Sequence, residues 1–199
     1  MNLDLLRSVF DEVGYTPTRL LVATLAGIVV IVGTVFGVAR GAERGARAAV
    51  WVTLAVVIAG ILVATLGLGL AEHEGRSVHN FDPFETIRRD YRSGKLSGAL
   101  NLWGNVVLFM PLGACIAWLS RGFSLVRLLW AVTIGGMLSA CIEIAQLTQE
   151  RMTDVDDVIL NTSGTLLGAV VTLTIIGVVR LIRWVGLSPA ERRARTHSR

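Results

Sequence analysis

VILNTSGTLLGAVVTLTIIGVVRLI, residues 158–182, is the stretch that decides the fold of this chain. Its apolar residues continue almost without interruption, and a charged side chain appears only at Arg180, close to the end. The hydrocarbon layer of a bilayer is roughly 30 Å thick, and about 20 helical residues cross it. The stretch therefore predicts a transmembrane helix.

The same apolar texture recurs along the rest of the chain. Of the 199 residues, 53% are apolar and 17% are charged, and the mean hydropathy is +0.62. These values exclude disordered, collagen-like and ordinary soluble proteins. Only helices and closed barrels satisfy their backbone groups in lipid, and runs of this length are helical in texture. We therefore predict an all-α, polytopic membrane helix bundle with five transmembrane helices, at residues 20–39, 50–70, 100–119, 128–146 and about 158–182.

A shorter helix is expected between the second and third spans. Asp82, Pro83 and Glu85 fit the N-cap, N1 and N3 positions of a helix. Apolar residues then recur at spacings of three and four until Gly94, which makes the segment amphipathic. We expect this helix to lie in the outer interface of the membrane.

Charge predicts the orientation of the bundle. Residues 1–80 carry two spans, 81–182 carry three, and 183–199 form a basic tail. One side of the bundle, including the tail, has eleven basic and two acidic residues, whereas the other has eight basic and twelve acidic residues. Because Lys and Arg are retained in cytoplasmic connections, the N-terminus should lie outside and the tail in the cytoplasm. The tail is interpreted as a topology anchor near anionic lipid, without a nucleic-acid partner.

Polar residues are dense where the fourth span returns to the fifth. Glu143 and Gln146 are three apart and share a helix face, and Asp157 and Asn161 lie one turn apart on the fifth span. The polar ends of the third, fourth and fifth spans lie on the outer side, so these groups can converge on one pocket. The residues predicted to line it are Asn105, Glu143, Gln146, Arg151, Asp154, Asp157 and Asn161.

Each of these residues also has a structural interpretation. An acidic residue at a helix start, such as Asp154, caps free N–H groups and favours the helix dipole. Asn105 and Asn161 can join helices by hydrogen bonds. Glu143 is harder to explain in this way, because a charge inside a span costs a few kcal/mol and needs a partner, for which Arg151 is the nearest candidate. A structural ion pair and a functional site both stay open.

The order and spacing of these residues, together with Phe109, Pro111, Gly113, Gly164 and Gly168, resemble the signature of the VanZ-like family of bacterial membrane proteins. The resemblance covers roughly residues 83–171. It implies a multi-pass protein of the bacterial cytoplasmic membrane. Small residues allow close approach of helices, so we interpret Gly113, Gly164 and Gly168, with Pro111, as positions of helix packing.

The resemblance also bears on function. The founding member of that family is associated with resistance to the glycopeptide teicoplanin, and no reaction is firmly established for the family. We predict that this chain binds a lipid head group or a lipid-linked cell-wall group and influences glycopeptide or lipoglycopeptide susceptibility. Arg151 would contact an anionic group, while Glu143 and Asp157 would accept hydrogen bonds from hydroxyl or ammonium groups.

Two other functions stay open. One is an intramembrane hydrolase or transferase acting on a lipid-linked substrate, with Glu143 or Asp157 as general base. In that case the aspartates would hold a divalent cation such as Mg²⁺ or Ca²⁺, because these cations prefer oxygen ligands. The other is a structural assembly partner, in which the polar residues satisfy one another and leave no cavity. The sequence contains no standard metal-binding motif and predicts no other cofactor.

Overall fold

Five helices make up the part of the chain that the structure, a computed structural model, describes: residues 43–66, 80–148 and 153–186. Four of them are long and apolar enough to cross a membrane, which confirms the predicted all-α membrane bundle. These four are α3 (Glu43–Thr65), α5 (Leu96–Leu119), α6 (Ser124–Thr148) and α7 (Val155–Val185). The remaining helix, α4 (Glu85–Ser93), is short.

The helices extend beyond the apolar runs that predict them. The structure begins α3 at Glu43 and α6 at Ser124, several residues before the predicted spans at 50–70 and 128–146. Backbone hydrogen bonding continues past the apolar runs into segments whose residue composition no longer marks a span. The predicted first span at 20–39 and residues 187–199 of the predicted tail lie outside the described residues.

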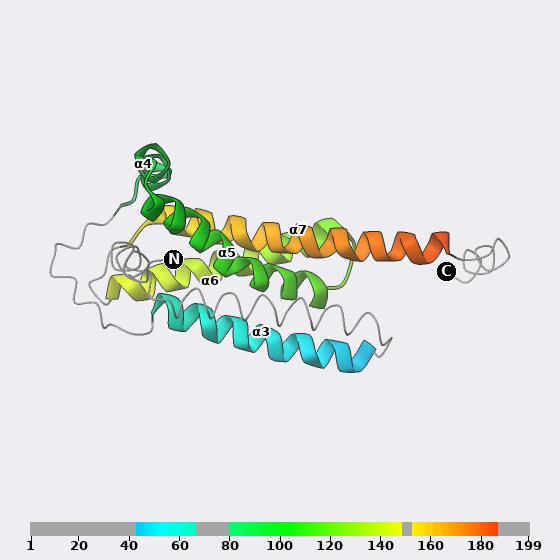
Figure 1. The fold of residues 1–199 in the computed structure, drawn as a ribbon. Coiled ribbons are helices and arrows are strands. Elements are labelled where there is room, and N and C mark those ends of the chain that lie inside the picture. Colours follow the sequence, from blue (N-terminus) through cyan, green and yellow to red (C-terminus); the bar gives the residue numbers. More distant parts are fainter. Residues whose placement is uncertain (1–42, 67–79, 149–152, 187–199) are drawn as a thin grey trace, which may run out of the picture.

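The direction of the chain alternates from one spanning helix to the next, so α5 and α7 run parallel to each other (Figure 1). Both begin at the end of the bundle where α3 and α6 finish, and α4 lies across the bundle axis at that end (Figure 1). Helix α5 is central, because it contacts α3, α4, α6 and α7. Its Phe109, Pro111 and Leu112 are buried and form the middle of the apolar core.

Backbone contact between α5 and α7 is the closest packing in the bundle. An added Cβ at Gly164 would lie 2.1 Å from the carbonyl oxygen of Val106, and one at Gly168 would lie 1.9 Å from that of Met110. Gly113 makes the reciprocal approach from α5 to the backbone of α7. No side chain larger than hydrogen fits at these positions unless the two helices separate.

The start of α4 differs from the sequence prediction. The N-cap residue is Phe84, and the predicted N-cap, Asp82, lies outside the helix. Phe84 has a φ of 67°, in the left-handed region that a bulky residue rarely adopts, and makes no capping bond with its own side chain. The prediction was wrong because the group that caps this helix comes from α7.

Arginines hold the other end of α5. The guanidinium of buried Arg127 donates to the carbonyl oxygen of Ala117, and Arg47 of α3 donates to that of Leu119 at 3.1 Å. The last carbonyls of a helix have no partner within it and carry partial negative charge. The two arginines therefore satisfy the C-terminus of the central helix from both neighbouring spans.

Replacing Gly168 by Ala should lower the free energy of unfolding by about 1–3 kcal/mol, because the added methyl overlaps the Met110 carbonyl and forces α5 and α7 apart. The measurement is helix loss during SDS titration in mixed micelles. Gly177→Ala on the same helix is the matched control, since a Cβ there meets nothing within 4 Å. Equal stability of the two variants would contradict this packing.

Candidate functional site

Acidic and amide side chains collect where α5 and α7 begin and α6 ends. Two helix N-termini point their positive dipole ends toward this region, which favours negative charge there. Asp154 is the N-cap of α7, and its side chain accepts a hydrogen bond from the backbone N–H of Asp156 at 2.9 Å. Asp157 and Glu143 lie nearby. The parallel arrangement of α5 and α7 thus prepares one end of the bundle for carboxylates.

Glu143 is buried, with 7% of its surface exposed, and its Oε2 accepts a hydrogen bond from the backbone N–H of Asp154 at 3.0 Å. This bond joins the end of α6 to the start of α7. The predicted partner of Glu143, Arg151, lies outside the described residues. Glu143 is thus held by a neutral backbone donor within the described part of the chain.

Asp157 of α7 contacts α5, the helix that corresponds to the third predicted span. Its Oδ1 accepts a hydrogen bond from Nδ2 of Asn105 on α5 at 2.7 Å. Its electrostatic neighbours are all acidic: Glu143, Asp154, Asp156 and Asp90. Five carboxyl groups therefore share this end of the bundle, and the short bond from Asn105 compensates only one oxygen of one of them.

Asn161 lies one turn deeper on α7 and is 4% exposed. Its Nδ2 donates to the hydroxyl of Ser139 on α6 at 2.9 Å, but its buried Oδ1 has no partner among the described residues. The buried hydroxyl oxygen of Thr153 is unpartnered in the same sense. A buried polar atom without a hydrogen bond is costly, so these two atoms call for a partner that the described residues do not provide.

Gln146 points away from the other predicted site residues. Its Nε2 donates to the carbonyl oxygen of Thr65 at the end of α3, at 3.3 Å. We define the polar cluster as the predicted residues that the structure brings together, with Thr153 added. Its members are Asn105, Glu143, Thr153, Asp154, Asp157 and Asn161.

Sequence reasoning missed the role of Asp156. This residue is fully buried, and its carboxylate accepts hydrogen bonds from the backbone N–H groups of Phe84 at 2.5 Å and Ile87 at 3.0 Å. It therefore caps α4 from α7. A signal was present, because steps of four back from Gly164 through Leu160 reach Asp156 on the buried face of the helix.

Asn80 strengthens the same junction. Its backbone pairs with the chain at Asp154 in an isolated parallel bridge, and its Nδ2 donates to the carboxylate of Asp154 at 3.2 Å and to the hydroxyl of Thr86 at 3.0 Å. Asp154 thus contacts Glu143 through its backbone and Asn80 through its side chain. Hydrogen bonds thus connect Glu143 and Asp154 of the polar cluster to the base of α4.

The acidic residues that the structure describes are not grouped as the ligands of a metal ion. Among residues 43–66, 80–148 and 153–186, no three His, Cys, Asp or Glu side chains are arranged to hold a metal ion. The carboxylates are instead distributed over separate partners: Asp156 on α4, Asp157 on α5, and Glu143 on the start of α7.

The four spanning helices of the described residues, with the polar cluster at one end of the bundle, define a polytopic membrane protein with an acid-rich site. The family model described as VanZ/LLP1 matches residues 48–177, and the chain belongs to this family. The resemblance seen in the polar block is confirmed, and the match begins earlier than that block, within α3. No curated protein and no solved structure shows a significant match to the chain.

Replacing Asp156 by Ala should release the base of α4, because two backbone N–H groups lose a charged acceptor. The loss of a helix cap costs about 1–2 kcal/mol, so the amides of Phe84 and Ile87 should exchange about 5- to 30-fold faster. Hydrogen–deuterium exchange of the detergent-solubilised protein measures this. Asp82→Ala is the control, since Asp82 is exposed and contacts α4 only through its backbone. Unchanged exchange in Asp156→Ala would exclude this capping role.

Proposed function

We propose that this VanZ-like membrane protein binds the head group of an envelope lipid, or a lipid-linked cell-wall group, at the polar cluster. The ligand presents hydroxyl or ammonium donors to the cluster. By holding such a group at the outer face of the membrane, the protein influences glycopeptide or lipoglycopeptide susceptibility. The family membership supports the membrane role, and the proposal about the ligand rests on the chemistry of the cluster.

One observation carries the proposal: two buried oxygen atoms of the polar cluster, Oδ1 of Asn161 and the hydroxyl oxygen of Thr153, have no hydrogen-bond partner among the described residues. The carboxylates of Glu143 and Asp157 lie beside these atoms, and each accepts one hydrogen bond through one oxygen, from the backbone N–H of Asp154 and from Asn105 respectively. The Lys and Arg side chains of the described residues form no ion pair with this cluster. Each ionised carboxylate can accept about four hydrogen bonds, so the cluster is suited to a ligand that donates several.

The acceptor oxygens of the polar cluster indicate which donor groups a ligand should carry. A primary ammonium group carries three donors and a positive charge, and sugar hydroxyls carry one donor each. Both occur in head groups that lie at the depth of this boundary. A carboxylate near a low-dielectric region gains more from such a charge-assisted bond than it does in water. Glu143 and Asp157 would accept from the ligand, and Asn161 would complete the hydrogen bonding.

A structural role is the second candidate. Glu143, Asp154 and Asp157 each already contact another helix or the α6–α7 return, which supports an assembly function for the cluster. The two functions differ in what happens when charge is removed. An assembly role predicts loss of fold, whereas ligand binding predicts loss of the ligand with the fold retained.

The binding test compares two probe lipids that differ in donors. The protein in detergent should bind phosphatidylethanolamine about tenfold more tightly than phosphatidylcholine, whose quaternary ammonium has no N–H donor. A glycosyl diacylglycerol tests hydroxyl donors in the same way. Glu143→Gln and Asp157→Asn keep the shape of the side chains and should abolish this preference. Native mass spectrometry measures the bound lipid, and helix content is recorded in parallel.

The control is Gln146→Glu, which changes charge on the same helix at a side chain that contacts α3 instead. It should leave the preference in place. Equal binding of all three lipids by the unaltered protein would refute ligand binding through donors. Loss of helix content in Glu143→Gln and Asp157→Asn would favour the assembly role.

The proposal requires the polar cluster to face outward. Alternation of the spanning helices puts Arg47, Arg127 and Arg180 at the opposite end of the bundle, which supports a cytoplasmic location for that end (Figure 1). In a variant without Cys115 and Cys141, a cysteine introduced at Ser93 should react with an impermeant maleimide in intact cells or spheroplasts. A cysteine at Ser124, at the basic end, should react only after permeabilisation. The reverse pattern would overturn this orientation.

A further inference from the structure

Helix α4 presents a different chemistry from the polar cluster. Its residues form rows at a spacing of four. Thr86 is buried and Asp90 half-buried, so this row faces the bundle. The next row contains Ile87 and Tyr91, with Phe84 close to it, and Tyr91 is 81% exposed. Exposed aromatic side chains at a membrane boundary suit the level where head groups meet acyl chains.

Arg88 and Arg92 form the third row, about 100° further around the helix than Ile87 and Tyr91. Both are exposed, and neither has a partner among the described residues. Arg89 differs, since its guanidinium contacts Asp90 at 3.6 Å and donates to the hydroxyl of Thr86 at 3.2 Å. The helix therefore has two free guanidinium groups one turn apart and one that is engaged.

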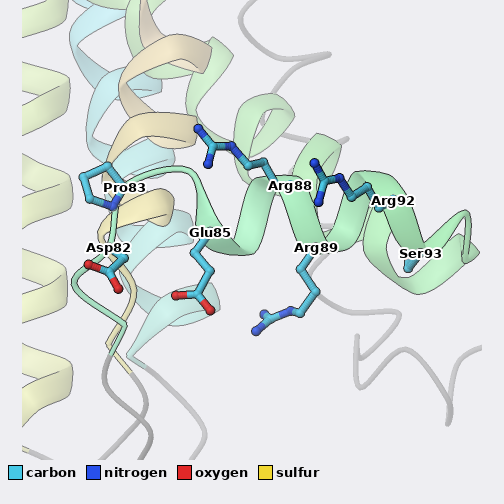
Figure 2. A pocket seen from close by; sticks show the side chains of 7 residues that line it. All are labelled: Asp82, Pro83, Glu85, Arg88, Arg89, Arg92 and Ser93. Carbon is cyan, nitrogen blue, oxygen red and sulfur yellow. The ribbon is translucent and has the colours of Figure 1, made fainter.

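The two kinds of arginine point in different directions. Figure 2 shows Arg88 and Arg92 on one side of α4, and Glu85 and Arg89 on the other. The Arg88 and Arg92 side chains point toward the side along which the neighbouring spanning helices continue (Figure 2). Arg88 and Arg92 border an open depression on α4 that Asp82, Glu85 and Arg89 also line. The two free guanidinium groups therefore point to the opposite side of α4 from the Glu85 and Arg89 side chains, along the bundle (Figure 2).

We propose that Arg88 and Arg92 bind the phosphate of an anionic phospholipid that lies against the bundle beneath α4. Guanidinium groups bind phosphate oxygens in bidentate geometry, and two of them one turn apart surround one phosphate. The aromatic row of Phe84 and Tyr91 borders the acyl region of the same lipid. This surface is separate from the polar cluster, whose spare acceptors would repel a phosphate.

The test uses three single-charge variants of the full-length protein: Arg88→Gln, Arg92→Gln and Arg89→Gln. Each removes one positive charge from the same helix, so diffuse attraction predicts the same effect for all three. Binding of phosphatidylglycerol to the detergent-solubilised protein is measured by native mass spectrometry. We expect about tenfold weaker binding for Arg88→Gln and Arg92→Gln, and less than about twofold for Arg89→Gln.

Two further measurements distinguish binding of a phospholipid from binding of free phosphate. Inorganic phosphate in excess should displace less than half of the bound phosphatidylglycerol, and Arg88→Lys should recover part of the affinity because it restores the charge. Equal effects of the three Gln variants, or full displacement by inorganic phosphate, would overturn the proposal. Hydrogen exchange of the α4 amides shows whether α4 stays packed on the bundle in each variant. Weaker lipid binding found only in variants whose α4 has detached from the bundle would also overturn the proposal. Phosphatidylethanolamine preference at the polar cluster is recorded separately, because the two sites can fail independently.

Discussion

Direct backbone contact between α5 and α7 is the constraint on which the rest of the structure depends. Gly164 and Gly168 bring α7 against the carbonyls of Val106 and Met110, and the two helices run parallel. Their N-termini must therefore lie at the same end of the bundle. Two positive dipole ends then favour the carboxylates that gather there, and Asn105 comes within hydrogen-bonding distance of Asp157.

Three neighbouring acidic residues show how this constraint assigns roles. Asp154 caps its own helix, Asp156 caps α4, and Asp157 meets Asn105 of α5. Successive residues at a helix start point in directions about 100° apart, so each reaches a different neighbour. An acid-rich segment that looks uniform in sequence thus becomes three distinct contacts. Replacement of one acid by another within this run is not conservative.

The sequence predicts the four described spans, the short helix and five of the six residues that define the polar cluster, because these follow from hydropathy and from spacings within one helix. It fails where a contact joins distant segments. Asp156 caps a helix whose first turn is 72 residues earlier, and no local pattern marks that pairing. Gln146 shares a face with Glu143, as predicted, yet it bonds to α3 because the end of that helix lies beside it. The partner of a side chain near a helix end depends on which other segments pack beside it, and this packing is not visible in the sequence.

The capping of α4 by Asp156 has a consequence for biosynthesis. Phe84 is synthesised 72 residues before its acceptor, an interval of roughly 4 to 14 s at ordinary translation rates. During that time the left-handed Phe84 lacks the bond that holds it, and α4 is positioned by its contacts with α5, among them the hydrogen bond from Asn101 to Asp90. Insertion of α7 brings the Gly164–Gly168 surface to α5 and the Asp156 carboxylate to α4 at the same time. The last described spanning helix to be made is therefore the one that completes the end of the bundle where α4 and the polar cluster lie.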